Sequence, residues 1–177
     1  MLFGTTLSKK IYMNNFKYEL IMWLNGFLKI IPGNIGCYIR KSLLPIKCGK
    51  NVKIWDNVHI DSPSKLTIGR AVSINRGSII NAGGKVSIGN NVLIGPNVTI
   101  YSQTHNFDDT NRLIKLQGYK LSEVIIGDNC WIGAGCIILP GVHIHNNSVI
   151  AAGTIITKNI SKNSVIRNRL FRIDRIR

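Results

Sequence analysis

The stretches IGNNVLIGPNVTI at residues 88–100 and IGDNCWIGAGCIILPGV at residues 126–142 decide how this chain folds. In both stretches an isoleucine opens each hexad, and Gly, Asn or other small residues fill most of the positions that follow. The same period extends outward to both sides, and its isoleucines are Ile54, Ile60, Ile68, Ile74, Ile80, Ile88, Ile94, Ile100, Ile126, Ile132, Ile138, Ile144, Ile150 and Ile156. A period of six fits neither an α-helix nor a hairpin ladder, so it indicates a repeat architecture.

The fifth residue of each hexad is small or β-branched, which is the second regularity of the repeat. These residues are Val58, Val72, Ser78, Val92, Val98, Thr104, Cys130, Cys136, Val142, Ser148 and Thr154. Glycine is frequent at the second position and Asn follows nearby, and both tolerate the positive φ of tight corners. Three hexads then form one triangular coil, and stacked coils bury an aliphatic column. The sequence therefore predicts an all-β chain, a parallel β-helix, in which Cys130 and Cys136 are core fillers.

Composition agrees with regular β structure and adds a strong positive charge. Hydrophobic residues make up 45% of the chain but aromatic residues only 7%, so small and β-branched residues must fill the core. The 23 Lys and Arg residues against 8 Asp and Glu residues give a formal net charge of +15, which attracts anions. Stacking aromatics are not interleaved with the basic residues, so nucleic acid is not an expected partner. The absence of CxxC pairs and of a recognised secretory signal favours the reducing cytoplasm.

The repeat divides the chain into three parts. Residues 1–50 lack the hexads, residues 51–160 carry them, and residues 161–177 form a basic tail. The phase of the repeat slips between 60 and 68, between 80 and 88, and across the loop 106–125. Loops that leave a regular scaffold often carry function. The tail brings arginines, whose guanidinium forks match phosphate geometry, at Arg167, Arg169, Arg172, Arg175 and Arg177.

The N-terminal part is predicted to be helical. Apolar spacing predicts a helix over residues 17–31 that ends at Pro32-Gly33, and a second short helix over residues 38–44. We expect these helices to cap the open end of the β-helix, whose strand edges would otherwise be exposed. The alternative is an amphipathic helix on a membrane surface, since the apolar run at 20–31 is too short to span a bilayer. Localisation is therefore predicted as cytoplasmic, with the inner face of the membrane as the alternative.

Several strings resemble the hexapeptide-repeat acetyltransferases, particularly the galactoside, maltose and related sugar O-acetyltransferases. They are IGPNVTIYSQTH at 94–105, IIGDNCWIGAGCIILPGV at 125–142 and SVIAAGTIITKNI at 148–160. The resemblance covers about residues 51–175. It implies that the coil is left-handed, that acetyl-CoA is the donor substrate without any metal, and that the protein is a homotrimer with sites between subunits. The string PGNIGCYIRKSLL at 32–44 resembles members from polysaccharide gene sets, which implies an O-antigen or capsule saccharide as acceptor.

The resemblance also assigns the acceptor side of the site. His105 matches the family's catalytic His, and the chemistry agrees, because a sugar hydroxyl needs a base whose pKa lies near the working pH. Asn75 matches the family's acceptor-holding Asn, and Asn81 is a weaker candidate for acceptor binding. The family's sugar O-acetyltransferases often have an acidic acceptor ligand where this chain has Gly83, so the resemblance does not identify the acceptor.

The donor side is assigned to the later coils and the tail. The resemblance implies that the backbone N–H of Ala134 steadies the oxyanion that forms from the thioester. The residues matched to donor binding are Trp131, Gly133, Ala134, Ala152, Thr157, Lys158, Arg172 and Arg175. The family's usual Gly-x-Pro before the first of these arginines is Asn168-Arg169-Leu170 here, which is a departure in the tail.

Two other enzyme classes share this scaffold. One is an N-acetyltransferase that acts on a nucleotide-linked amino sugar, with the same coil and donor. The other is a metal enzyme, which needs three converging His ligands. The chain offers His59, His105, His143 and His145. His143 and His145 form an HxH pair, which we expect to point to opposite faces of a strand, so no metal site is predicted.

Overall fold

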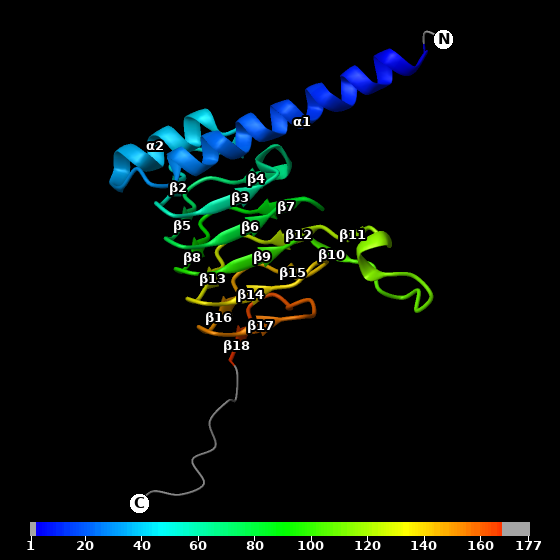
Figure 1. Ribbon diagram of the computed structural model, residues 1–177. Coiled ribbons are helices and arrows are strands. Elements are labelled where there is room, and N and C mark those ends of the chain that lie inside the picture. Colours follow the sequence, from blue (N-terminus) through cyan, green and yellow to red (C-terminus); the bar gives the residue numbers. More distant parts are fainter. Residues whose placement is uncertain (1–2, 168–177) are drawn as a thin grey trace, which may run out of the picture.

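The computed structural model describes the backbone of residues 3–167 and the side chains of residues 16–167. Short parallel strands stack into a triangular, left-handed β-helix of about 6 turns, with two helices over one end (Figure 1). The helices are α1 (Phe3–Leu28) and α2 (Gly33–Leu43). Within residues 3–167 there is no helix with the length and apolar character needed to cross a bilayer.

Each side of the triangle is one parallel sheet. The first sheet contains β1 (Lys47–Cys48), β4 (Leu66–Ile68), β7 (Val86–Ile88), β12 (Val124–Ile126) and β15 (His143–Ile144). The second contains β2 (Lys53–Ile54), β5 (Ser73–Ile74), β8 (Leu93–Ile94), β13 (Trp131–Ile132), β16 (Val149–Ile150) and β18 (Val165–Ile166). The third contains β3 (His59–Asp61), β6 (Ile79–Asn81), β9 (Thr99–Tyr101), β14 (Ile137–Ile138) and β17 (Ile155–Ile156).

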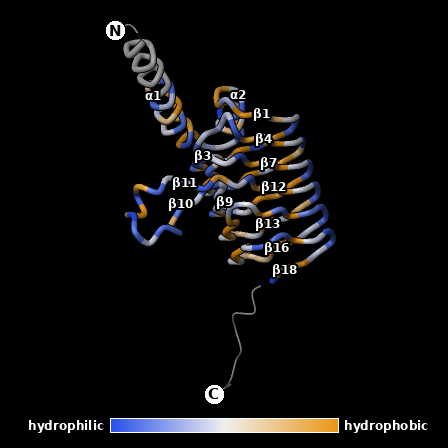
Figure 2. The backbone as a smooth tube through the Cα atoms, turned by 90° about the vertical axis from the view of Figure 1, so that its right-hand side faces the viewer, coloured by the Kyte–Doolittle hydropathy of each residue, from blue (hydrophilic) through white to orange (hydrophobic). Residues whose placement is uncertain are grey.

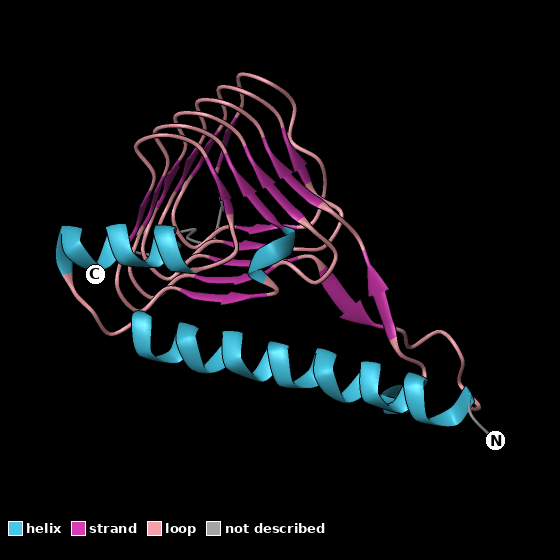
Figure 3. Cartoon of the chain, turned by 90° about the horizontal axis from the view of Figure 1, so that it is seen from above, coloured by secondary structure: helices cyan, strands magenta, loops and turns pink. Residues whose placement is uncertain are grey.

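The chain visits the three sheets in turn, so every coil has three corners (Figure 3). We call the corner between the first and second sheets the first corner. The second corner joins the second sheet to the third, and the third corner leads from the third sheet to the next coil. A 3₁₀ turn, η1 (Pro63–Lys65), lies at the third corner of the first coil.

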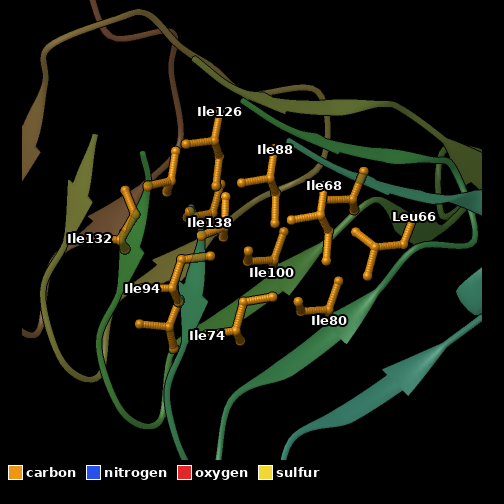
Figure 4. Packing of buried hydrophobic residues seen from close by; sticks show 14 of the residues in the cluster. Leu66, Ile68, Ile74, Ile80, Ile88, Ile94, Ile100, Ile126, Ile132 and Ile138 are labelled. Carbon is orange, nitrogen blue, oxygen red and sulfur yellow. The ribbon is translucent and has the colours of Figure 1, made fainter. Parts of the chain in front are cut away.

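The isoleucines that open the hexads form the core, as the period predicts. In the second sheet Ile54, Ile74 and Ile94 pair in register, and each is at most 1% exposed. Figure 4 shows isoleucines from all three sheets pointing into the space between them. Figure 2 shows hydrophobic segments stacked in the same places from coil to coil. Burial of these columns supplies the main stabilisation of the fold.

The corners use glycine differently from the prediction. Positive φ falls on the fourth residue of the hexad, as at Asn91 (φ 56) and Asn97 (φ 55), so the expectation for Asn is confirmed. The second-position glycines do not have positive φ, and that part of the prediction is wrong. They are required because successive coils stack closely: a Cβ added at Gly69 would lie 2.6 Å from the carbonyl oxygen of Gly89. Real Cβ atoms do not approach backbone atoms so closely.

The phase slips all fall at the third corner, where the connections of the first three coils are longer. The prediction that Thr104 fills the core is wrong for this reason. At Ser102 the chain is still buried, but Thr104 is already exposed in a strand that has left the coil. The other fifth-position residues named above are buried.

Helices and sheets extend beyond the predicted limits. Helix α1 begins well before residue 17, and α2 begins at Gly33 rather than at residue 38. Gly36 allows α2 to lie against the connection from α1, because a Cβ there would clash with the carbonyl oxygen of Ile31. The sheets likewise begin with β1 and continue to β18, which pairs with β16 outside the predicted range 51–160.

One arginine ties both helices to the first coil. Arg40 on α2 is 0% exposed. Its Nε donates to the carbonyl oxygen of Ile54 at 2.8 Å, and its Nη1 donates to those of Leu28 and Ile31, each at 2.7 Å. Carbonyls at the end of a helix lack partners within the helix, so Arg40 satisfies the end of α1 and joins it to β2. Asn25 on α1 adds a bond from its Nδ2 to the carbonyl oxygen of Ile60 at 2.9 Å.

Replacing Arg40 with Met would leave these three carbonyls without their donor. We expect the free energy of unfolding to fall by about 3 kcal/mol, measured by urea denaturation followed by circular dichroism. The neighbouring, half-buried Lys41 provides the control, and Lys41→Met should change the value by less than about 0.5 kcal/mol. Equal effects of the two substitutions would contradict the assigned role of Arg40.

Candidate functional site

The predicted loop 106–125 is an arm that projects from the third corner. Strand β10 (Gln103–His105) pairs antiparallel with β11 (Tyr119–Leu121), and a 3₁₀ turn, η2 (Ile114–Leu116), lies between them. Figure 1 shows the arm extending sideways from the coil. The tip is ordered by Gln117, whose Nε2 donates to the carbonyl oxygens of Asp109 and Arg112 at 2.8 and 2.9 Å.

His105 is the last residue of β10 and is exposed on this arm. It pairs with Tyr119 across the antiparallel strands, and the two rings lie with centroids 4.4 Å apart. The contact with Tyr119 restricts the orientation of the imidazole while leaving it accessible. Sequence reasoning missed Tyr119, because no pattern showed that the loop returns as a strand beside His105.

Asn81 lies at the same corner as His105 and belongs to a chain of polar contacts. Its Nδ2 donates to Asp61 Oδ2 at 3.4 Å, and Asp61 Oδ1 lies 3.0 Å from His59 Nε2. Its Oδ1 accepts the backbone N–H of Gly83 at 3.2 Å. Asp61 is half-buried, and sequence reasoning missed it, because it stands at a phase slip outside the regular hexads.

Gly83, where the family often has an acid, is buried beside the side chain of Gln103. A Cβ at Gly83 would meet Oε1 of Gln103, so a larger residue there would require the Gln103 side chain to move. Lys65 also donates from Nζ to the carbonyl oxygen of Gly83 at 2.7 Å. The carboxylate that this corner does offer is that of Asp61, one coil away.

Four of the six predicted donor residues that the structure describes lie at the second corner or on the strand that leads to it. Trp131 opens β13 and is 55% exposed, with Leu93 and Val149 as its neighbours in the sheet. Gly133 and Ala134 follow β13, and Ala152 stands beneath them after β16. A Cβ added at Gly133 would lie 2.5 Å from the backbone nitrogen of Ala152, so these two coils are in close contact. Asn75 lies at the same corner, two coils nearer to the helices.

The second corner leaves backbone N–H groups unpaired where the first corner pairs them. At the first corner, the third residue of a hexad donates its backbone N–H to the side chain of the equivalent residue in the next coil. Asn90 receives the N–H of Arg70 at 3.0 Å, and Asn146 receives that of Asp128 at 2.9 Å. The equivalent residues at the second corner, Ala134 and Ala152, are exposed, and their N–H groups have no acceptor among the residues described. These N–H groups beside Trp131 are available to a ligand.

The predicted site residues therefore divide between two corners of one chain. His105 and Asn81 lie at the third corner, as do Thr157 and Lys158, which follow β17. Asn75, Trp131, Gly133, Ala134 and Ala152 belong to the second corner or to the strand that leads to it. Arg172 and Arg175 lie outside the described residues. A single chain does not bring the proposed base and Ala134 to the same corner.

The cysteines and the HxH pair do not add to this site. Cys136 is buried as predicted, and burial raises the pKa of its thiol, which favours the uncharged form. The expectation that His143 and His145 point apart is wrong: Ile144 between them is buried, so both rings face outward and stack with centroids 3.8 Å apart. Burial and the nearby His145 lower the pKa of His143. Among residues 16–167 there is no group of three or more His, Cys, Asp or Glu side chains placed to hold a metal.

Comparisons with known proteins agree with this architecture. The family model described as hexapeptide repeat of succinyl-transferase matches residues 85–102 and 123–158. The crystal structure of a galactoside acetyltransferase in complex with coenzyme A is 33% identical, covers 85% of this chain and 74% of its own, and superposes with a TM-score of 0.73. A maltose O-acetyltransferase from Clostridium difficile 630 is 31% identical, covers 84% of this chain and 79% of its own, and has a TM-score of 0.73.

Among curated relatives, the galactoside O-acetyltransferase of Lactococcus lactis subsp. lactis (strain IL1403) is 56% identical over 43 residues. That match spans 24% of this chain and 21% of the relative, so this chain matches about a fifth of the relative's length. The two solved structures are similar over most of both chains. On that similarity, the chain belongs to the hexapeptide-repeat acetyltransferase family.

Proposed function

We propose that this protein transfers an acetyl group from acetyl-CoA to a saccharide hydroxyl, with His105 as the general base. The observation that carries the proposal is the position of His105, an accessible imidazole held beside Tyr119 on an arm of the acetyltransferase scaffold. Acetyl-CoA as donor is supported by the related galactoside acetyltransferase, which was crystallised with coenzyme A. A cytoplasmic location fits this choice of donor.

The transfer needs one proton to move and one charge to be stabilised. His105 takes the proton of the hydroxyl as its oxygen attacks the thioester carbon. The carbonyl oxygen becomes an oxyanion, which accepts a hydrogen bond from the unpaired N–H of Ala134. The C–S bond then breaks, and the protonated His105 returns its proton to the leaving thiolate. The products are the acetyl ester and CoA with a free thiol.

Donor binding is proposed along the second corner. Trp131 offers an exposed apolar surface, and the N–H groups of Ala134 and Ala152 offer donors in successive coils. Gly133 keeps the approach to Ala152 open because it has no side chain. Thr157 and Lys158, and the tail residues Arg172 and Arg175, are proposed for the nucleotide end of the donor, where positive charge suits phosphate.

We propose a homotrimer in which each site is shared by two subunits. The third sheet lies between the second and third corners, and its outward-facing ladder contains Ile79, Thr99, Ile137 and Ile155. Ile155 is 54% exposed, which favours burial against other subunits. If three third sheets face a common threefold axis, the third corner of each subunit adjoins the second corner of the next. His105 of one subunit then faces the donor corner of its neighbour.

The proposed acceptor is a sugar of a surface polysaccharide such as O-antigen or capsule. Asn75 and Asn81 are proposed to hold it, and Asp61, bonded to Asn81, supplies the carboxylate that position 83 lacks. A nucleotide-linked amino sugar is the competing acceptor. Assays with matched hydroxyl and amino sugars distinguish the two, because only the latter yields an acetamide.

Removing the base should abolish turnover without removing the donor site. For His105→Ala we expect kcat to fall by a factor of about 100 or more, measured as CoA release corrected for hydrolysis. Acetyl-CoA affinity should stay within about twofold, because the proposed donor contacts, Trp131 and the N–H groups of Ala134 and Ala152, are unchanged. His145→Ala, at another exposed His, should leave kcat unchanged. Full activity of His105→Ala would show that another group is the base.

Pairing the N–H of Ala134 within the protein should close the donor site. Ala152→Asn places an amide below Ala134 in the same relation that Asn146 has to Asp128. We expect acetyl-CoA affinity, measured by calorimetry, to fall by about tenfold, while the free energy of unfolding rises by about 1 kcal/mol.

The control is the reverse change at the first corner. Asn146→Ala should lower the free energy of unfolding by about 1 kcal/mol and leave acetyl-CoA affinity unaltered. Unchanged affinity in Ala152→Asn would mean that the donor does not use the second corner.

Two impaired variants should restore activity when they assemble together. When the His105→Ala and Ala152→Asn chains are co-expressed, mixed trimers form. Some of their sites combine the intact His105 of an Ala152→Asn chain with the intact second corner of a neighbouring His105→Ala chain. At limiting acetyl-CoA, random mixing should give about a quarter of the activity of the unmodified protein. Activity no greater than the mean of the two separate variants would place the whole site within one chain.

A further inference from the structure

The outward face of α1 carries a stripe of large apolar side chains. Phe16, Leu20, Trp23 and Phe27 recur along α1 at intervals of four, three and four residues, Ile30 follows in the turn after the helix, and each is at least 53% exposed. This spacing places the four helical residues on one face of α1. We call these five residues the outer stripe.

The outer stripe faces away from the β-helix. On the opposite side of α1, Asn25 is 1% exposed and bonded to the first coil, and Leu28 is 6% exposed in the core cluster. At about 100° per residue, Asn25 lies about 200° from both Trp23 and Phe27, on the opposite face of the helix. The chain's own coil therefore cannot cover the stripe. Figures 1 and 3 also show α1 running past the edge of the coil.

Helix α2 adds to the same end of the molecule. Its buried side contains Cys37 and Arg40, whereas Ile35 and Tyr38 are each 73% exposed. A groove of about 480 Å³ over Gly26 is lined by Glu19, Met22, Trp23, Phe27 and Ile30. Both helices thus turn apolar and aromatic side chains away from the coil. We call the outer stripe together with Ile35 and Tyr38 the end face.

The positive charge near the end face favours one class of binding partner over another. Residues 1–50 contain eight basic residues, of which Arg40 is buried in the contacts described above, and a single acidic one, Glu19. Lys17 is exposed on α1, and Lys29 is half-buried in the turn that follows it. Two copies joined through this end would bring their positive charges together, which is unfavourable. An anionic lipid surface attracts the same charges and accepts the apolar side chains, and Trp and Tyr are enriched at that boundary.

We propose that the end face docks on an anionic membrane surface, with the outer stripe buried at the boundary between headgroups and acyl chains. Helix α1 then lies in the plane of the membrane and the axis of the β-helix points away from it. The His105 arm leaves the third coil, so it stands roughly 20 Å from the outward side of α1, given helix and strand spacings of about 10 and 4.8 Å.

This placement deepens the proposed function, on which its catalytic meaning rests. An acceptor saccharide attached to a membrane lipid would reach the arm without leaving the surface. The docking itself does not depend on the chemistry at His105, so the two proposals fail separately.

The test is sedimentation of the full-length protein with lipid vesicles. Phosphatidylcholine vesicles with about one-third phosphatidylglycerol should bind the protein, and binding should weaken with added salt and without the anionic lipid. Trp23→Ser/Phe27→Ser should reduce the partition coefficient by about tenfold or more. Val165→Ser is the matched control, because Val165 is also exposed, at 59%, but lies at the other end of the coil.

Acetyl-CoA affinity and oligomeric state are measured for the same variants in the absence of lipid. We expect both to equal those of the unmodified protein, which shows that the variants fold and that the donor site is intact. The proposal is overturned if the unmodified protein does not bind anionic vesicles, or if Val165→Ser weakens binding as much as Trp23→Ser/Phe27→Ser does. It is also overturned if the double variant changes the oligomeric state, because the end face would then be an interface between subunits.

Discussion

Close stacking of backbone corners is the constraint on which the rest of this structure depends. Each coil is hydrogen-bonded strand to strand to the next, so the corners must also stack at the strand spacing. A Cβ at Gly69 or Gly133 would prevent that contact, and the left-handed φ at Asn91 turns the chain so that the following Val92 is buried. The isoleucine columns stabilise the coil, but the corners determine which sequences can form it.

This constraint explains what the sequence could predict. The hexads predicted the β-helix and its core because one period determines both burial and turning. The role of the second-position glycine was misjudged, because its neighbour is in the next coil and not along the chain. Thr104 was placed in the core because the count of six was continued beyond Ser102. Ser102 is still buried in the coil, but the chain has left the coil at Thr104. Tyr119 and Asp61 were missed for a related reason, since each meets its partner only after folding.

The candidate site shows the same limit. A resemblance along the chain could name His105 and Ala134, but it could not show that they occupy different corners of one triangle. Nor could it show that Ala134 keeps an unpaired N–H where Asp128, six residues earlier, donates its own to Asn146. A single alanine one coil below, Ala152, makes that difference. The chemistry proposed for this corner depends on the small side chain of Ala152 as much as on the groups that are present.

The longer connections at the third corner show where the β-helix accommodates inserted residues. Inserted residues there, including the whole arm with His105, leave the register of all three sheets intact, as the pairing of β7 with β12 across the arm shows. At the second corner, where the donor is proposed to bind, successive coils stack closely. Insertions can therefore change the length and sequence of the third corner, which is proposed to serve the acceptor, without altering the stacking on which the proposed donor site depends.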